Sequence, residues 1–172
     1  MLANLYMRRF VLGWKTLGQE QRLDAHIVNY ADDFVIVMRP GRAEEAMSAM
    51  RTIIGKIRLT VNETKTRICR LPEETFDFLG YTFGRQYSRR TGRAYLGPKP
   101  SRKKIGRLCD AISTATDRRT TWQDVREVVA DLNAKLRGWS NYFREGTVVH
   151  AYEMVMKHTR RRLRRWLGVK HK

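Results

Sequence analysis

Two short apolar runs that flank a pair of aspartates limit most tightly what this chain can fold into. In the stretch HIVNYADDFVIVM, residues 26–38, β-branched and aromatic residues stand on both sides of Asp32 and Asp33. Runs of this length and composition are typical of β-strands. A carboxylate buried without a partner is costly, so the aspartates belong either at an exposed turn, which Asp favours, or in a metal site. The pattern predicts an antiparallel hairpin with both aspartates at or next to its turn.

The rest of the first hundred residues mixes helical and strand-like patterns. Apolar side chains at three- and four-residue spacing predict helices at 2–17 and near 42–55. Alternating residues at 59–71, around a polar turn at 62–65, predict a strand, and residues 75–97 predict a further hairpin. The order helix, hairpin, helix, strand, hairpin predicts an α+β fold with an antiparallel sheet.

After residue 100 the apolar spacing is helical throughout. It predicts one helix at about 105–115, a second at about 125–143 and a third at about 147–167. Thr121 and Asp124 have the spacing of a capping box, which predicts that the second helix begins there. This part of the chain is expected to be all helical.

A change of composition separates these two parts. The stretch GPKPSRKK, residues 97–104, interrupts both kinds of periodicity with proline, glycine and charge. We therefore expect an α+β domain at 1–98 and a helical domain at 99–172. No internal repeat is present.

The chain is strongly basic. It has 35 Lys and Arg against 17 Asp and Glu, a formal net charge of +18. Residues 101–172 hold 18 basic and 7 acidic side chains, so the surplus is denser there than in residues 1–100. A surplus of this size indicates a surface that binds a polyanion such as nucleic acid, although ribosomal or membrane-surface contact would give the same charge.

The cysteines and the hydropathy favour an intracellular protein. Cys69 and Cys109 lack the CxxC or histidine spacing of a zinc site, so we expect thiols in a reducing compartment. No apolar run approaches the length of a membrane span, and the N-terminus does not resemble a signal peptide. The expected location is cytoplasmic, of prokaryotic type, with no membrane partner.

Several motifs occur in the order of a known enzyme family. YADD between two apolar strands resembles the polymerase hairpin of reverse transcriptases of the group II intron type. LANLYM at 2–7 resembles the helix after the family's Gly-rich motif, and LTVNETKTRI at 59–68 resembles the next palm motif. FDFLGYTF at 76–83 resembles the primer-grip hairpin, and LRGWSNYF at 136–143 resembles the maturase, or thumb, signature.

The resemblance implies a partial polymerase palm followed by a helical thumb or maturase region. The implied activities are RNA-templated DNA synthesis with Mg²⁺ and binding of intron RNA that assists splicing. Asp32 matches the family's metal-binding aspartate, Asp33 is its less directly ligating neighbour, and Lys65 would reach the triphosphate. Residues implied to lie against the nucleotide, the primer terminus or the primer strand are Tyr30, Ala31, Phe78, Leu79 and Gly80.

The residues themselves leave simpler interpretations open. Lys65 also reads as a solvated lysine in a polar turn, and Trp139, Tyr142 and Phe143 most simply pack in the core. Some arginines of the last helix are only solvated, since five in six positions cover too much of a helix to face one groove. The expected phosphate-contacting set, which should make binding of RNA or RNA–DNA duplex sensitive to salt, is Arg102, Lys103, Lys104, Arg107, Arg161, Arg162 and Arg165.

Parts of the family pattern are absent from these 172 residues. The 172 residues contain no fingers and no Gly-rich motif. They also contain no earlier palm aspartate, since Asp24 is the only nearby upstream acid and lies in a polar loop. We expect a C-terminal portion that is inactive alone, binds Mg²⁺ only with the missing half, and works beside an N-terminal reverse-transcriptase fragment. Two alternatives stay open: an RNA-binding splicing module with vestigial catalytic residues, and part of a defence- or CRISPR-associated reverse transcriptase.

Overall fold

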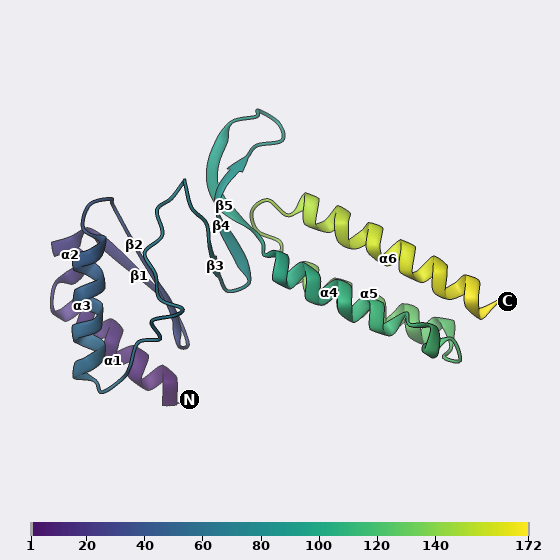
Figure 1. Cartoon of the computed structure of the whole chain (residues 1–172), viewed down its shortest axis with the longest axis horizontal. Coiled ribbons are helices and arrows are strands. Elements are labelled where there is room, and N and C mark those ends of the chain that lie inside the picture. Colours follow the sequence, from purple (N-terminus) through teal and green to yellow (C-terminus); the bar gives the residue numbers. More distant parts are fainter. Residues whose placement is uncertain (1, 172) are drawn as a thin grey trace. The chain divides into compact units, whose positions relative to one another are not determined.

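The computed structural model describes residues 2–171. These form two compact units, divided between Arg70 and Leu71 and called unit 1 and unit 2 below (Figure 1). The fold is α+β, as predicted. No helix in residues 2–171 has both the length and the apolar character needed to cross a membrane. The two predicted domains, 1–98 and 99–172, stay a prediction.

Unit 1 holds three helices and one hairpin. Its elements are α1 (Leu2–Thr16), α2 (Gln19–Leu23), β1 (Ala25–Tyr30), β2 (Asp33–Met38) and α3 (Ala43–Lys56). β1 and β2 pair antiparallel from Ala25 opposite Met38 to Tyr30 opposite Asp33. The predicted helices at 2–17 and 42–55 and the predicted hairpin at 26–38 are confirmed.

One face of the hairpin packs on the helices. Alternate strand residues lie on opposite faces, so Ile27 of β1 and Ile36 of β2 meet across the ladder and contact the core. The Phe34 ring packs at a tilt against that of Phe10 of α1, with ring centroids 4.9 Å apart. The buried side chains of this core are Met7, Phe10, Trp14, Leu23, Ala25, Ala46, Met50, Ile53 and Ile54.

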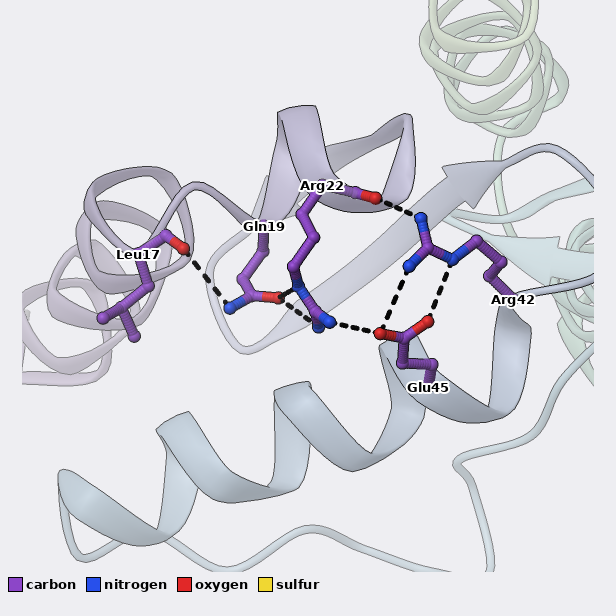
Figure 2. Close-up of polar contacts among 5 residues, drawn as sticks. All are labelled: Leu17, Gln19, Arg22, Arg42 and Glu45. Carbon is purple, nitrogen blue, oxygen red and sulfur yellow. Dashed lines mark hydrogen bonds and ion pairs between the residues drawn. The ribbon is translucent and has the colours of Figure 1, made fainter.

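A polar network joins α2 to the first turn of α3 (Figure 2). The Glu45 carboxylate lies between two guanidinium groups: it accepts from Arg22 Nη1 and, at 2.9 Å, from Arg42 Nε. Arg42 also donates to the backbone carbonyl of Arg22, and Arg22 donates to Gln19 Oε1 at 2.8 Å. The hydrogen bond from Arg42, with help from the charge of Arg22, lowers the pKa of Glu45. The network fixes the segment from which β1 starts.

Unit 2 holds a three-stranded sheet and a helical bundle. The antiparallel strand order is β3 (Phe76–Phe78), β4 (Tyr81–Tyr87), β5 (Ala94–Pro100). The helices are α4 (Arg102–Ala115), the 3₁₀ turn η1 (Arg118–Thr120), α5 (Val125–Tyr142) and α6 (Val149–Lys170). α4 packs against both α5 and α6 (Figure 1). The predicted hairpin at 75–97 and the three predicted helices are confirmed. The buried side chains of the bundle are Ile105, Leu108, Ile112, Val128, Leu132, Ala151, Val155 and Trp166.

The strand predicted at 59–71 is wrong. These residues form an irregular segment, although the predicted polar turn is present: Lys65 N and Thr66 N both donate to the carbonyl of Asn62. Leu59 and Val61 pack on the core of unit 1, which explains their alternation without a ladder. A strand needs a partner for its backbone groups, and in the described residues β1 and β2 pair only with each other.

The predicted cap of α5 is also wrong in detail. Asp124, rather than Thr121, is the N-cap residue, and its carboxylate accepts from Arg126 N at 2.7 Å. The Thr121 hydroxyl instead donates to the carbonyl of Arg118 at 3.0 Å. The helix therefore starts after Asp124, because Asp satisfies a free N–H group of the first turn as well as Thr does.

Candidate functional site

The turn of the first hairpin presents the two aspartates. Because Tyr30 pairs with Asp33, the turn consists of Ala31 and Asp32 alone. Ala31 has a φ of +54°, a left-handed conformation that costs a residue with a Cβ about 1–2 kcal/mol. Asp32 and Asp33 are both exposed, and Tyr30 is 64% exposed. The turn therefore offers two adjacent carboxylates and a tyrosine ring to solvent.

Asn29 braces this turn from within β1. Its side-chain amide donates to the carbonyl of Ala31 at 3.1 Å and to that of Asp33 at 3.3 Å. These bonds hold the backbone on both sides of Asp32. The sequence did carry a signal for this role: Asn29 shares its face of the strand with Ala25 and Ile27, where an apolar residue is expected.

The described residues do not make a complete metal site. Carboxylate oxygens suit Mg²⁺, so Asp32 and Asp33 fit as part of a ligand set. In residues 2–171 no cluster of three or more His, Cys, Asp or Glu side chains could hold an ion. Asp24 cannot complete the set, because it pairs with Arg39 at 3.0 Å at the open end of the hairpin, roughly 17 Å away by strand length.

Lys65 lies in the anchored turn that follows α3. Arg51 of α3 donates two hydrogen bonds to the Glu63 carboxylate, at 3.1 and 2.7 Å, and this lowers the pKa of Glu63. Lys65 N donates to the carbonyl of Asn62 at 3.1 Å, and the Lys65 side chain is exposed. The side chain is thus free to reach a phosphate while its backbone is held on α3.

The predicted primer-grip turn is formed by Leu79 and Gly80. Both have positive φ values, +50° and +82°, as in the type I′ turns that suit two-residue hairpins. The carbonyl of Leu79 accepts from the Tyr142 hydroxyl at 2.7 Å, and the carbonyl of Gly80 accepts from Ser101 N at 2.9 Å. Phe78 pairs with Tyr81 at the base of the turn. α4 and α5 therefore fix this turn from two sides.

Phe143 packs in the core as predicted and Trp139 is partly buried, whereas Tyr142, also predicted to pack there, is exposed. The Trp139 and Phe143 rings lie 4.9 Å apart, and Phe143 is buried at 3% exposure. Tyr142 is 54% exposed, yet its hydroxyl bonds to Leu79, and its own carbonyl accepts from the Tyr81 hydroxyl at 2.8 Å. Sequence reasoning missed this reciprocal bonding.

The basic residues of α4 and α6 divide into exposed and engaged side chains. Lys104 is half-buried, and its stem lies over Gly80, where an added Cβ would meet Lys104 Cε at 3.0 Å. Arg162 is half-buried and donates to the carbonyls of Ser113 and Thr116 at 2.7 and 2.8 Å. Its guanidinium is thus hydrogen-bonded to the end of α4, although Arg162 was predicted to contact phosphate. The exposed members of the predicted set are Arg102, Lys103, Arg107, Arg161 and Arg165.

Exposed cations form a stripe along α6. Lys157, Arg161 and Arg165 recur every four residues and are all exposed. Four residues advance about 6 Å along a helix, so the stripe is a row of evenly spaced positive charges on one side of α6. Lys103 and Arg107 repeat this spacing on α4. Lys157 was missed from the sequence because it lies before the arginine run.

Comparison with protein families agrees with this arrangement. Residues 1–83 match the family model described as reverse transcriptase (RNA-dependent DNA polymerase). Residues 105–172 match the model described as group II intron, maturase-specific domain. None of the curated proteins compared with the chain matches it. The first match contains the hairpin and Lys65, and the second contains α5, α6 and most of α4. Together the two matches show that the chain belongs to the group II intron-type reverse transcriptases/maturases.

Proposed function

We propose that the chain carries the YADD metal-site hairpin of an RNA-directed DNA polymerase and binds intron RNA or RNA–DNA duplex through α4 and α6. The proposal rests on one observation above others: two family matches lie in order on one chain, one over the exposed carboxylates and one over the exposed cations. The maturase-specific match favours a group II intron enzyme over a defence- or CRISPR-associated one.

Each residue of the hairpin has a separate task in this proposal. Asp32, with Asp33 beside it, contributes oxygen ligands to Mg²⁺, which when bound neutralises charge on the phosphates during nucleotide transfer. The bonds from Asn29 keep Asp32 in place. Tyr30, exposed beside the turn with Ala31, lies against the primer terminus, and Lys65 reaches the triphosphate.

The hairpin needs further carboxylates from another strand. In the described residues, neither β1 nor β2 has a second strand beside it, and the outer face exposes Val28 and Val37 by about half. A strand that pairs with the free edge of β1 or β2 could bring the missing acid next to Asp32. We therefore propose that an N-terminal reverse-transcriptase segment completes the site, and that residues 1–172 alone do not polymerise DNA.

Primer extension on an RNA template with Mg²⁺ tests this proposal. The chain alone should give no product, and adding a fragment that carries fingers and the earlier palm aspartate should restore extension. Asp32→Ala should abolish the restored activity, whereas Asp24→Ala, which alters an acid at the far end of the hairpin, should keep most of it. Robust extension by the chain alone, lost in Asp32→Ala, would refute the need for a partner.

Nucleic-acid binding is tested separately through its salt dependence. Each phosphate that the protein neutralises lowers the logarithm of affinity by roughly 0.7–0.9 per logarithmic unit of salt. Arg161→Ala with Arg165→Ala should therefore weaken binding and flatten the salt dependence. Arg90→Ala, an exposed arginine in the β4–β5 loop, is the matched control and should change neither. A salt-independent affinity of the unmodified chain would refute phosphate binding.

A binding module with vestigial carboxylates is the second candidate. It is favoured by the exposed aspartate pair, around which the described residues gather no third ligand. This candidate predicts salt-dependent RNA binding without extension, even when the complementing fragment is present. The two assays together separate it from the polymerase proposal.

A further inference from the structure

Trp122 is the most exposed large apolar side chain that the structure describes. It is 79% exposed, whereas Trp14 and Trp166 are at most 2% exposed and Trp139 is partly buried. A tryptophan carries a large apolar area, and single exposed apolar residues are common enough to need no function. What distinguishes Trp122 is how the loop around it is held.

α6 clamps the loop on both sides of Trp122. Lys170 Nζ donates to the carbonyl of Thr121 at 2.8 Å and to that of Gln123 at 2.7 Å. One turn earlier on α6, Trp166 Nε1 donates to the Thr120 hydroxyl at 3.0 Å. The residues before and after Trp122 are thus fixed to a helix, and the ring is held out to solvent. Because the backbone on both sides of Trp122 is already fixed, a partner that stacks on the ring need not order the loop.

Charge identifies the partner more closely. Segment 117–127 contains three arginines, three acids and no net charge, and the Asp117 and Asp124 carboxylates accept from backbone N–H groups at helix starts. The loop itself therefore does not attract phosphates. Arg161 and Arg165, however, lie exposed on the same half of α6 that clamps the loop. An RNA strand held by its phosphates on α6 would bring its bases to this end of the bundle.

We propose that Trp122 is a stacking platform for an unpaired RNA base, in a strand whose phosphates lie on the cations of α6. The inference rests on the RNA binding proposed above and specifies the form of RNA that is bound. Aromatic rings stack on any base, whereas a paired base in a helix has both its faces covered. The loop therefore selects RNA with unpaired bases without reading their sequence.

Binding to two RNAs that share one stem tests the proposal with the full chain. One is a hairpin with a loop or bulge of unpaired purines, and the other is the same stem as a fully paired blunt duplex. Trp122→Ala should weaken binding of the first by roughly 5- to 150-fold, the loss expected from one stacked base, and leave the duplex unaffected. Trp122→Phe should retain most of the affinity. Tyr87→Ala, which removes another exposed aromatic ring, on β4, should have no effect.

Salt separates stacking from phosphate contact in the same experiment. Trp122→Ala should lower affinity by one constant factor at every salt concentration, whereas Arg161→Ala should change the slope. Equal affinities of Trp122→Ala and the unmodified chain for the unpaired-base hairpin would overturn the inference. So would an equal loss on both RNAs. If the unmodified chain binds neither RNA, the proposed function itself fails, and this outcome is distinct from a failure of Trp122 alone.

Discussion

Replacing Arg162 by alanine should destabilise the helical bundle, whereas replacing its neighbour Arg161 should not. Both arginines lie in the run RRRLRR of α6, and from the sequence both were expected to contact phosphate. In the structure Arg161 is exposed, and Arg162 donates to groups at the end of α4. The pair therefore gives a matched test of which arginine is structural.

The size of the effect follows from what Arg162 leaves behind. Its guanidinium donates to the Ser113 carbonyl, to the Thr116 carbonyl and, at 3.2 Å, to the Thr116 hydroxyl. A hydrogen bond from a charged group contributes about 1.5–3 kcal/mol, and Thr116 is only 3% exposed, so water replaces the lost donor poorly there. Because Ser113 is only partly buried, we expect Arg162→Ala to cost about 2–4 kcal/mol rather than the full sum. Arg161→Ala should stay within about 0.5 kcal/mol.

Thermal unfolding followed by far-ultraviolet circular dichroism measures the difference. For a unit of this size the Arg162→Ala cost corresponds to a fall in Tm of about 10–30 °C, against about 4 °C or less for Arg161→Ala. Below its Tm, Arg162→Ala should keep the salt dependence of RNA binding, and Arg161→Ala should reduce it. The reasoning is refuted if Arg162→Ala has the same Tm as Arg161→Ala and also flattens the salt dependence of RNA binding, since Arg162 would then face the nucleic acid.

Two further predictions concern the other turns. Leu79→Asn should raise Tm or leave it unchanged, because Asn tolerates the φ of +50° that strains leucine. Gly80→Ala should lower Tm, because the added Cβ would meet Lys104 Cε at 3.0 Å and residue 80 has a φ of +82°. A lower Tm for Leu79→Asn would contradict the strain argument. Since Arg51 lowers the pKa of Glu63, this ion pair stabilises the fold above the usual glutamate pKa of about 4.3 and stops doing so as the pH falls through the lowered value. Glu63→Gln should therefore unfold at a lower Tm than the unmodified chain near neutral pH, with a gap that closes in acid; a gap that does not change with pH would count against the ion pair.

The first hairpin was predictable because local patterns decide it. The two apolar runs in 26–38 and the helical spacing on both sides agree with one another, and burial of one face fixes the register. The alternation at 59–71 misled because the same pattern suits a loop whose apolar residues touch a core. Whether such a segment becomes a strand depends on a partner with free backbone groups, and this is a tertiary property.

The role of each arginine on α6 was not predictable from the composition of the run. A helix faces its core with residues three and four apart, and Val155, Thr159 and Trp166 mark that buried face. Arg162 lies between Thr159 and Trp166 along this face, so the spacing did contain a signal for it. The sequence could not supply its acceptors, because the carbonyls of Ser113 and Thr116 become available only where α4 ends beside α6.

The primer-grip turn and the maturase signature are physically one structure within unit 2. The Tyr81 hydroxyl donates to the carbonyl of Tyr142, and the Tyr142 hydroxyl donates to the carbonyl of Leu79, so the turn and the end of α5 are joined in both directions. Ser101 N, at the start of α4, binds the carbonyl of Gly80 from the other side. The turn that is proposed to touch the primer therefore cannot move without α4 and α5. It follows that a shift of these helices on binding RNA would be transmitted directly to the turn at Leu79 and Gly80. The hydroxyl of Tyr142 makes this link, which a phenylalanine at the same position would lack.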